Sequence, residues 1–226
     1  MTIEDIIARL SQAYGPPRRR PHRDPLSELI LTILSQNTSD VNSGRAFERL
    51  TALGSWERVS QAPVEKIAEA IRPGGLAQVK APRLLAILRD IQEQRGSLGL
   101  SFLDRLSLDE ARTWLRRLPG VGPKTAACVL LFSLGKPALP VDTHLHRVAQ
   151  RLGLIGARVT PEKAHQLLEA MVLPDRIYPF HLLMIEHGRR TCLARRPRCP
   201  QCVLLEGCPT GKALLGDQAS KGAGQR

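Results

Sequence analysis

The segment Leu118-Pro-Gly-Val-Gly-Pro-Lys-Thr-Ala126 separates two helical sequence patterns. Before it, Ser107 and Glu110 have the spacing of a capping box at the start of an apolar-periodic helix. After it, Pro123 suits the first turn of a second helix, which the pattern extends over residues 124–134. The sequence therefore predicts two helices joined by a tight hairpin.

The hairpin contains two glycines, Gly120 and Gly122. Glycine permits backbone angles that are closed to other residues, and it leaves its N–H group open to an approaching anion. A nucleic-acid phosphate is such an anion. A glycine turn between two packed helices, with no ligand, is the alternative interpretation, and the glycine pair alone does not exclude it.

Two ionisable residues follow the hairpin, Lys124 and, eighteen residues later, Asp142. Lys124 is expected in the first turn of its helix, where the positive end of the helix dipole disfavours an ammonium and so favours a nucleophilic neutral amine. Asp142 lies in Val141-Asp-Thr-His144, just before an apolar-periodic segment. It can therefore cap a helix and also act as a carboxylate.

Four of the five cysteines form the run Cys192-x6-Cys199-x2-Cys202-x5-Cys208. Thiolates this close in sequence can bind a metal, and the clustering argues against the disulfide framework of a secreted protein. Zinc and a [4Fe-4S] cluster both suit four thiolates. Most structural zinc sites, however, use two Cys-x-x-Cys pairs, and this run has one.

Together, the hairpin, the segment around Asp142 and the cysteine run resemble the endonuclease III family of helix-hairpin-helix DNA glycosylases and abasic-site lyases. The resemblance covers about residues 26–208. It implies that Lys124 attacks C1′ of a damaged nucleotide, that Asp142 assists, and that the hairpin glycines hold the DNA backbone. It also implies a structural [4Fe-4S] cluster bound by Cys192, Cys199, Cys202 and Cys208. Independently of the family, an amine beside a carboxylate suits this attack, because the carboxylate stabilises positive charge in the sugar.

By the same resemblance, Gln36-Asn37 and Gly75-Leu-Ala-Gln-Val-Lys80 match the family's two inserting loops. An enzyme that acts on a base must extrude the nucleotide from the duplex and fill the vacated space. Asn37 aligns with the position where many relatives carry the filling glutamine, with Gln36 displaced by one, and Leu76 aligns with an apolar wedge for the opposite strand. Without the resemblance, a polar turn and a core leucine are the simpler interpretations.

The fold is predicted to be all-α, because no stretch alternates convincingly at period two. The resemblance implies a six-helix barrel over residues 26–136, with the helix-hairpin-helix at about 107–134. Residues 1–25 and 137–211 would form the iron–sulfur cluster domain, and the active site would lie in the cleft between the two domains. Residues 212–226 lose the apolar pattern and are predicted to be disordered.

Composition favours a DNA partner. The net charge is +12 over 226 residues, which favours a polyanion, and aromatic residues make up only 4% of the chain, too few for single-strand stacking platforms. Duplex DNA with damaged bases or abasic sites is therefore the expected substrate of a monomeric enzyme. No segment suits a membrane span or a signal peptide, so we expect a cytoplasmic protein that associates with the nucleoid through DNA.

The sequence thus predicts a bifunctional DNA glycosylase and β-elimination lyase. Oxidised pyrimidines are favoured as substrates by family association alone, and uracil or mismatched bases stay open as alternatives. A monofunctional glycosylase, or a DNA-binding iron–sulfur protein with weak lyase chemistry, is the other alternative. Lys124 argues against it, because monofunctional relatives lack a lysine at that position.

Overall fold

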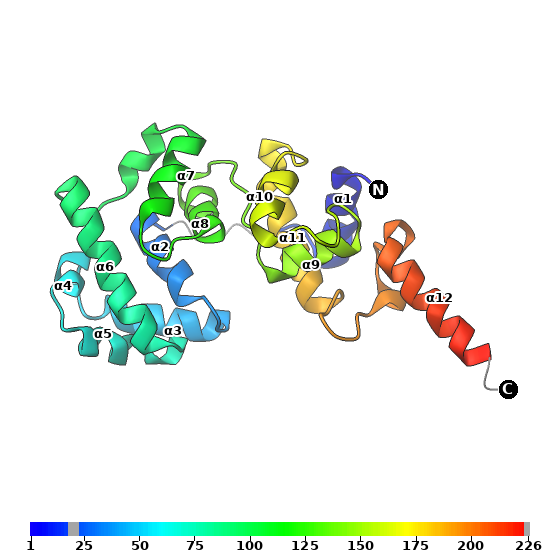
Figure 1. The fold of residues 1–226 in the computed structure, drawn as a ribbon, viewed down its shortest axis with the longest axis horizontal. Coiled ribbons are helices and arrows are strands. Elements are labelled where there is room, and N and C mark those ends of the chain that lie inside the picture. Colours follow the sequence, from blue (N-terminus) through cyan, green and yellow to red (C-terminus); the bar gives the residue numbers. More distant parts are fainter. Residues whose placement is uncertain (18–22, 224–226) are drawn as a thin grey trace. The chain divides into compact units, whose positions relative to one another are not determined.

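The computed structural model describes residues 1–17 and 23–223, with side chains through Gly216. Over this part of the chain the secondary structure is helical and contains no strand, which confirms the all-α prediction. The chain divides into two compact units, Arg20–Ala138 and Met1–Arg19 with Leu139–Arg226 (Figure 1). No helix in the described part is both long enough and apolar enough to cross a membrane.

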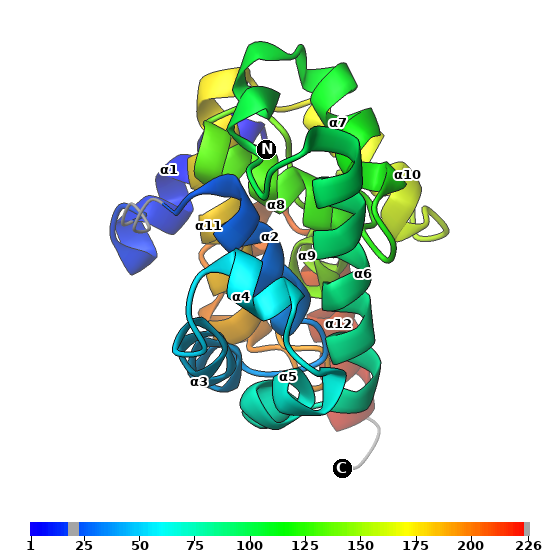
Figure 2. The same cartoon turned by 90° about the vertical axis from the view of Figure 1, so that its left-hand side faces the viewer.

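The Arg20–Ala138 unit is built around α2, whose start follows from its sequence. Asp24 caps the helix by accepting hydrogen bonds from the backbone N–H groups of Leu26 and Ser27, and Pro25 fits the first turn. Most of α2 is buried, and it packs mainly against α8, while α5 lies against α6 (Figure 2). The helices are α2 (Pro25–Leu34), α3 (Asp40–Thr51), α4 (Trp56–Ser60), α5 (Val64–Ile71), α6 (Ala77–Arg95), α7 (Leu108–Arg117) and α8 (Pro123–Leu134), with short 3-10 turns η1 (Arg72–Gly74) and η2 (Ser101–Arg105).

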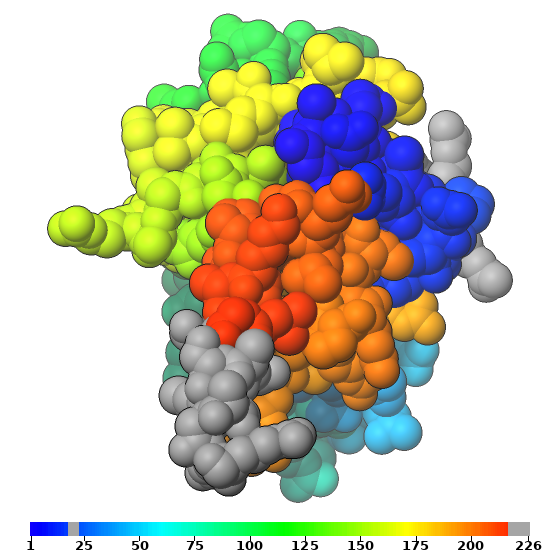
Figure 3. Space-filling model, turned by 90° about the vertical axis from the view of Figure 1, so that its right-hand side faces the viewer, coloured from blue at the N-terminus to red at the C-terminus, as the bar shows by residue number. Residues whose placement is uncertain are grey.

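In the other unit, α11 packs against α9 and against the N-terminal helix α1, while α12 lies against η4 and η5. Arg9 of α1 donates a hydrogen bond to Glu206 at 2.8 Å, and Figure 3 shows the blue N-terminal residues against the orange segment that carries the cysteines. The elements are α1 (Ile3–Tyr14), α9 (Thr143–Arg151), α10 (Pro161–Glu169), η3 (Pro174–Arg176), α11 (Ile177–Arg190), η4 (Cys199–Gln201), η5 (Leu205–Gly207) and α12 (Pro209–Ala223).

The C-terminal segment differs from its prediction. Residues 212–226 were expected to be disordered, but the helix α12 continues as far as Ala223, and residues 224–226 lie outside the described part of the chain. Its first turn is tied to the cysteine segment, because Lys212 N–H donates to the Cys208 carbonyl at 3.1 Å and Gly211 N–H donates to Cys208 Sγ at 3.3 Å. A helix that starts from a fixed turn avoids the cost of nucleation. The small, polar composition of the residues after 212 was therefore a poor predictor of their secondary structure.

Candidate functional site

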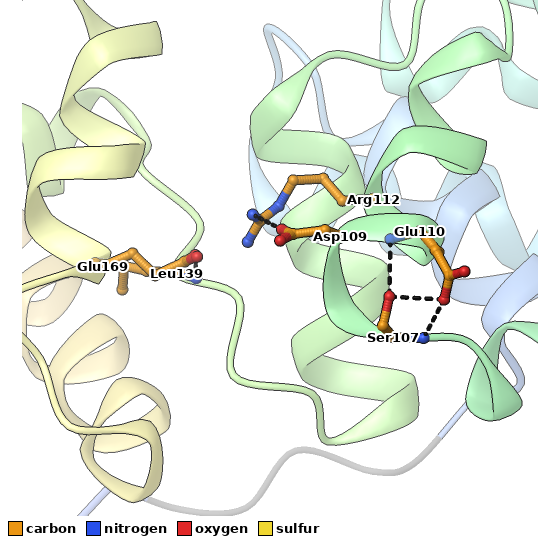
Figure 4. Close-up of polar contacts among 6 residues, drawn as sticks. All are labelled: Ser107, Asp109, Glu110, Arg112, Leu139 and Glu169. Carbon is orange, nitrogen blue, oxygen red and sulfur yellow. Dashed lines mark hydrogen bonds and ion pairs between the residues drawn. The ribbon is translucent and has the colours of Figure 1, made fainter.

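The predicted hairpin is present between α7 and α8. Ser107 Oγ accepts a hydrogen bond from Glu110 N–H at 3.3 Å, and the Glu110 carboxylate accepts one from Ser107 N–H at 2.9 Å (Figure 4). This capping box confirms the predicted start of α7. At the hairpin itself, Val121 is buried and its N–H donates to the Leu118 carbonyl at 3.1 Å, so the apolar residue between the two glycines anchors the turn.

The two hairpin glycines have different roles. Gly120 has φ +72°, as predicted, and a Cβ there would lie 2.7 Å from Cδ of Arg83. Gly122 has φ −86°, so the expectation that it needs an angle closed to other residues is wrong. It instead caps α8 in an extended conformation, and a Cβ there would meet no heavy atom within 4 Å. Packing and backbone geometry therefore explain Gly120 but leave Gly122 facing open space.

Lys124 and Asp142 both begin helices, in different units. Lys124 is half-buried in the first turn of α8, next to the buried Thr125. Asp142 is the N-cap of α9, and its Oδ1 accepts a hydrogen bond from Leu145 N–H at 2.8 Å. The predicted capping role of Asp142 is thus confirmed. The cap engages one carboxylate oxygen, and a carboxylate has two, so capping and charge stabilisation are compatible.

The segment Gln36-Asn37 follows α2, and its two side chains lie in different surroundings. The Gln36 amide is half-buried: it accepts a hydrogen bond from Arg83 at 3.4 Å and donates one to Thr125 Oγ1 at 3.4 Å. Asn37 is exposed and has φ +56°. The structure therefore joins Gln36 to the first turn of α8, and through Arg83 to the hairpin at Gly120, while Asn37 stands at the surface.

Leu76 is an exposed residue at the start of α6. Its side chain is 54% exposed, so it is not a core leucine. Its backbone is left-handed, with φ +51°, a conformation that costs energy for any residue with a branched side chain. Only three non-glycine residues of the described chain have positive φ, and two of them are Asn37 and Leu76.

The resemblance placed Lys80 at the end of an inserting loop, residues 75–80, which is wrong from Ala77 onward because α6 begins there. Sequence reasoning also missed the burial of Lys80, whose side chain is 2% exposed. Its Nζ donates to the carbonyls of Leu34, Gln36 and Gly74 at 2.8, 2.8 and 2.9 Å. Burial lowers the pKa of this amine from its ordinary value. A signal existed in the sequence, because position 80 lies on the apolar stripe of α6 that Leu84, Ile87, Leu88 and Ile91 form, where a lysine must find buried acceptors.

The four clustered cysteines line one pocket with about 390 Å³ of empty space, including space open to solvent. Arg151 Nη1 donates to Cys192 Sγ at 3.3 Å, and Gly211 N–H donates to Cys208 Sγ. Burial, together with the nearby cysteine thiolates, raises the pKa values of Cys199 and Cys202. Within the described residues, no three His, Cys, Asp or Glu side chains form a group that could hold a single metal ion. Four soft sulfur atoms line the one pocket, and N–H groups are directed at two of them.

Comparison with known proteins agrees with these features. Residues 30–174 match the HhH-GPD superfamily of base excision DNA repair proteins. The chain is 34% identical over 207 residues to endonuclease III of Thermotoga maritima, covering 91% of this chain and 92% of the relative. It is 31% identical over 206 residues to endonuclease III of Escherichia coli K12, covering 90% and 93%. A solved covalent intermediate of an endonuclease III with DNA superposes with a TM-score of 0.80 at 28% identity, covering 95% of this chain and 99% of that one.

The helical fold, the hairpin and the family match define a base excision DNA repair protein, and the chain belongs to the HhH-GPD superfamily. Within the superfamily it is a homologue of endonuclease III, as the sequence resemblance predicted. It is therefore a DNA-binding enzyme of the DNA glycosylase and abasic-site lyase class.

Proposed function

We propose that the protein removes oxidised pyrimidines from duplex DNA and then cleaves the backbone at the abasic site, with Lys124 as nucleophile. The observation that carries this proposal is the position of Lys124, in the first turn of α8 and two residues after Gly122, where the helix N-terminus meets open space. A phosphate held by the N–H groups of that helix end would bring its sugar within reach of the amine.

The proposed chemistry uses one amine and one carboxylate. The neutral Lys124 amine attacks C1′ as the bond to the base breaks, and Asp142 stabilises the positive charge that develops in the sugar. The base leaves with a proton, and ring opening gives a Schiff base between Lys124 and C1′. Loss of a C2′ proton then expels the 3′ phosphate, and water hydrolyses the Schiff base to free the lysine.

The surroundings of Gln36 and Asn37 support a division of roles between these two neighbours. Asn37 is exposed at the surface, so we assign it the filling of the vacated space. Gln36 is hydrogen bonded to Thr125, the neighbour of Lys124, so we place it beside the reacting nucleotide. The exposed Leu76 serves as the wedge against the opposite strand.

Cys192, Cys199, Cys202 and Cys208 fit a [4Fe-4S] cluster, because four sulfur donors line one pocket and N–H groups are directed at sulfur. When bound, the cluster would supply four iron–thiolate bonds that cross-link the segment between α11 and α12. The residues around the pocket, with Arg9 bonded to Glu206, would hold that segment as a fixed surface.

A net charge of +12 favours a monomer on polyanionic DNA.

The test is borohydride trapping on a duplex with an abasic site. The wild-type protein should give a covalent adduct, and Lys124→Gln should abolish it while most DNA affinity persists, since one phosphate contact is a small part of the total. Asp142→Asn keeps an N-cap and removes the charge, so it should stay folded and lose on the order of 10²-fold in base excision. An undiminished adduct with Lys124→Gln would move the nucleophile elsewhere.

The substrate is tested on duplexes carrying oxidised pyrimidines, uracil or mismatches. Preferential excision of oxidised pyrimidines is the expected result. Faster excision of uracil or of a mismatched base would overturn the substrate assignment, while leaving the roles of Lys124 and Asp142 to the trapping experiment.

A further inference from the structure

We propose that Lys80 is a positioning residue that holds the two DNA-inserting loops in one fixed arrangement before DNA binds. The inference rests on the proposed function of Asn37 and Leu76 in those loops. It adds a residue that touches neither the substrate nor the reacting atoms, and that acts through the backbone of both loops.

The hydrogen bonds of Lys80 connect the two loops directly. An ammonium has three N–H donors, and the three carbonyls that accept from Nζ use all of them. The carbonyls of Leu34 and Gln36 belong to the end of α2 and the loop after it, and the Gln36 carbonyl immediately precedes Asn37. The Gly74 carbonyl belongs to η1, two residues before Leu76. One side chain thus spans from one loop to the other.

Both loops have a conformation that needs such support. Asn37 and Leu76 have φ of +56° and +51°, and non-glycine residues persist in that region only where the surroundings hold them. The backbone of Lys80 adds to the restraint, because its N–H donates to the Leu76 carbonyl at 2.9 Å. Lys80 therefore fixes the residue before Asn37 with its side chain, and both sides of Leu76 with its side chain and main chain.

The burial of Lys80 also calls for an explanation beyond packing. Lys80 is 2% exposed and lies on an apolar stripe. A methionine would fill the same space without the cost of removing an ammonium from water. The described acceptors of Lys80 are the loop carbonyls. Holding them before DNA binds means that the loops need not be ordered during nucleotide extrusion, and preorganisation of this kind raises rate or affinity.

The experiment compares trapping on two abasic substrates. A duplex requires insertion of the loops, whereas a single strand with the same abasic site does not. Lys80→Met keeps the length and loses the donors. It should slow borohydride trapping on the duplex by about tenfold or more, and on the single strand by no more than about twofold. An unchanged ratio of duplex to single-strand rates would overturn the inference.

Lys136 supplies a matched control in the same unit. Its Nζ also donates to backbone carbonyls, those of Asp104 and Leu106 at 3.0 and 2.7 Å, and neither belongs to the inserting loops. Lys136→Met should therefore leave the ratio of duplex to single-strand trapping unchanged. A fall in the ratio equal to that of Lys80→Met would show a general effect of lost stability and would contradict the positioning role.

A double-mutant cycle gives a second, independent measurement. If Lys80 acts by holding Leu76, then Leu76→Ala should slow duplex trapping less in the Lys80→Met protein than in the wild type. Additive effects would refute the connection. If Lys80→Met does not fold, Lys80→Gln replaces it in the same assays. This variant keeps two N–H donors without a buried charge, and the same ratio of duplex to single-strand trapping rates is measured. Failure of the wild-type protein to trap on either substrate would instead overturn the proposed function.

Discussion

Replacing Gly120 by alanine should destabilise the protein by about 1–2 kcal/mol, whereas the same change at Gly122 should leave stability within about 0.5 kcal/mol and weaken DNA binding. The two residues are separated only by Val121 and differ in geometry. Gly120 has φ +72° and packs against Arg83, while Gly122 has φ −86° and an empty position where a Cβ would lie.

The magnitudes follow from those geometries. At Gly120, alanine takes on the cost of the left-handed conformation, roughly 1–2 kcal/mol. Its Cβ would also lie 2.7 Å from Cδ and Nε of Arg83, which must move and weaken its contact with Gln36. At Gly122 two effects oppose each other: alanine reduces unfolded-state entropy by about 0.4–1 kcal/mol, and it is a poorer N-cap by a similar amount.

The assays are urea unfolding for stability and fluorescence anisotropy for binding to undamaged duplexes at fixed salt. Gly122→Ala places a methyl group where the phosphate is proposed to approach, so affinity should fall by about tenfold, equivalent to one charge-assisted hydrogen bond. The fall should be the same for every sequence, because backbone contacts carry no sequence information. A stable Gly122→Ala protein with unchanged affinity, or equal destabilisation by both changes, would refute the reasoning.

Three further changes test other parts of the site. Leu76→Ala should lower the melting temperature by no more than about 4 °C, because Leu76 is 54% exposed, while Leu84→Ala, on the same helix with 1% exposure, should cost about 2–5 kcal/mol; equal effects would place Leu76 in the core. Anaerobically purified protein should contain iron and sulfide in about a 1:1 ratio, and Cys199→Ser should lose both together with part of its helicity; zinc without iron would exclude the cluster. Hydrogen bonds from Ser107 lower the pKa of Glu110 in the folded protein below its ordinary value of 4.5. The unfolded chain therefore binds more protons than the folded protein in this pH range. The resulting stabilisation is complete above pH 4.5 and is lost as the pH falls through the pKa of Glu110 in the folded protein. Glu110→Gln keeps the capping box, and the acid-induced fall in its urea midpoint should be smaller than that of the wild type; an identical fall would mean that Glu110 does not contribute.

The sequence by itself determined the features that depend on residues close together in the chain. The capping box of Ser107 and Glu110 and the cap by Asp142 join residues three apart, so their spacing was sufficient to place the starts of α7 and α9. Helical periodicity likewise gave the all-α class, since each helix satisfies its own backbone. The motifs around Lys124, Asp142 and the cysteines gave the family, which the comparisons confirm.

The tertiary structure decided what depends on distant partners. Lys80 bonds to Leu34, 46 residues earlier, and Gln36 bonds to Thr125, 89 residues later, and no local pattern encodes those pairs. Gly122 is a separate case: the motif predicted its backbone angle wrongly, although a Cβ there would meet no heavy atom within 4 Å. A buried lysine or a half-buried glutamine is stable only when it forms hydrogen bonds with groups from distant parts of the chain. The packing of α2, α6 and α8 brings those groups close, and the neighbours in the sequence do not determine it.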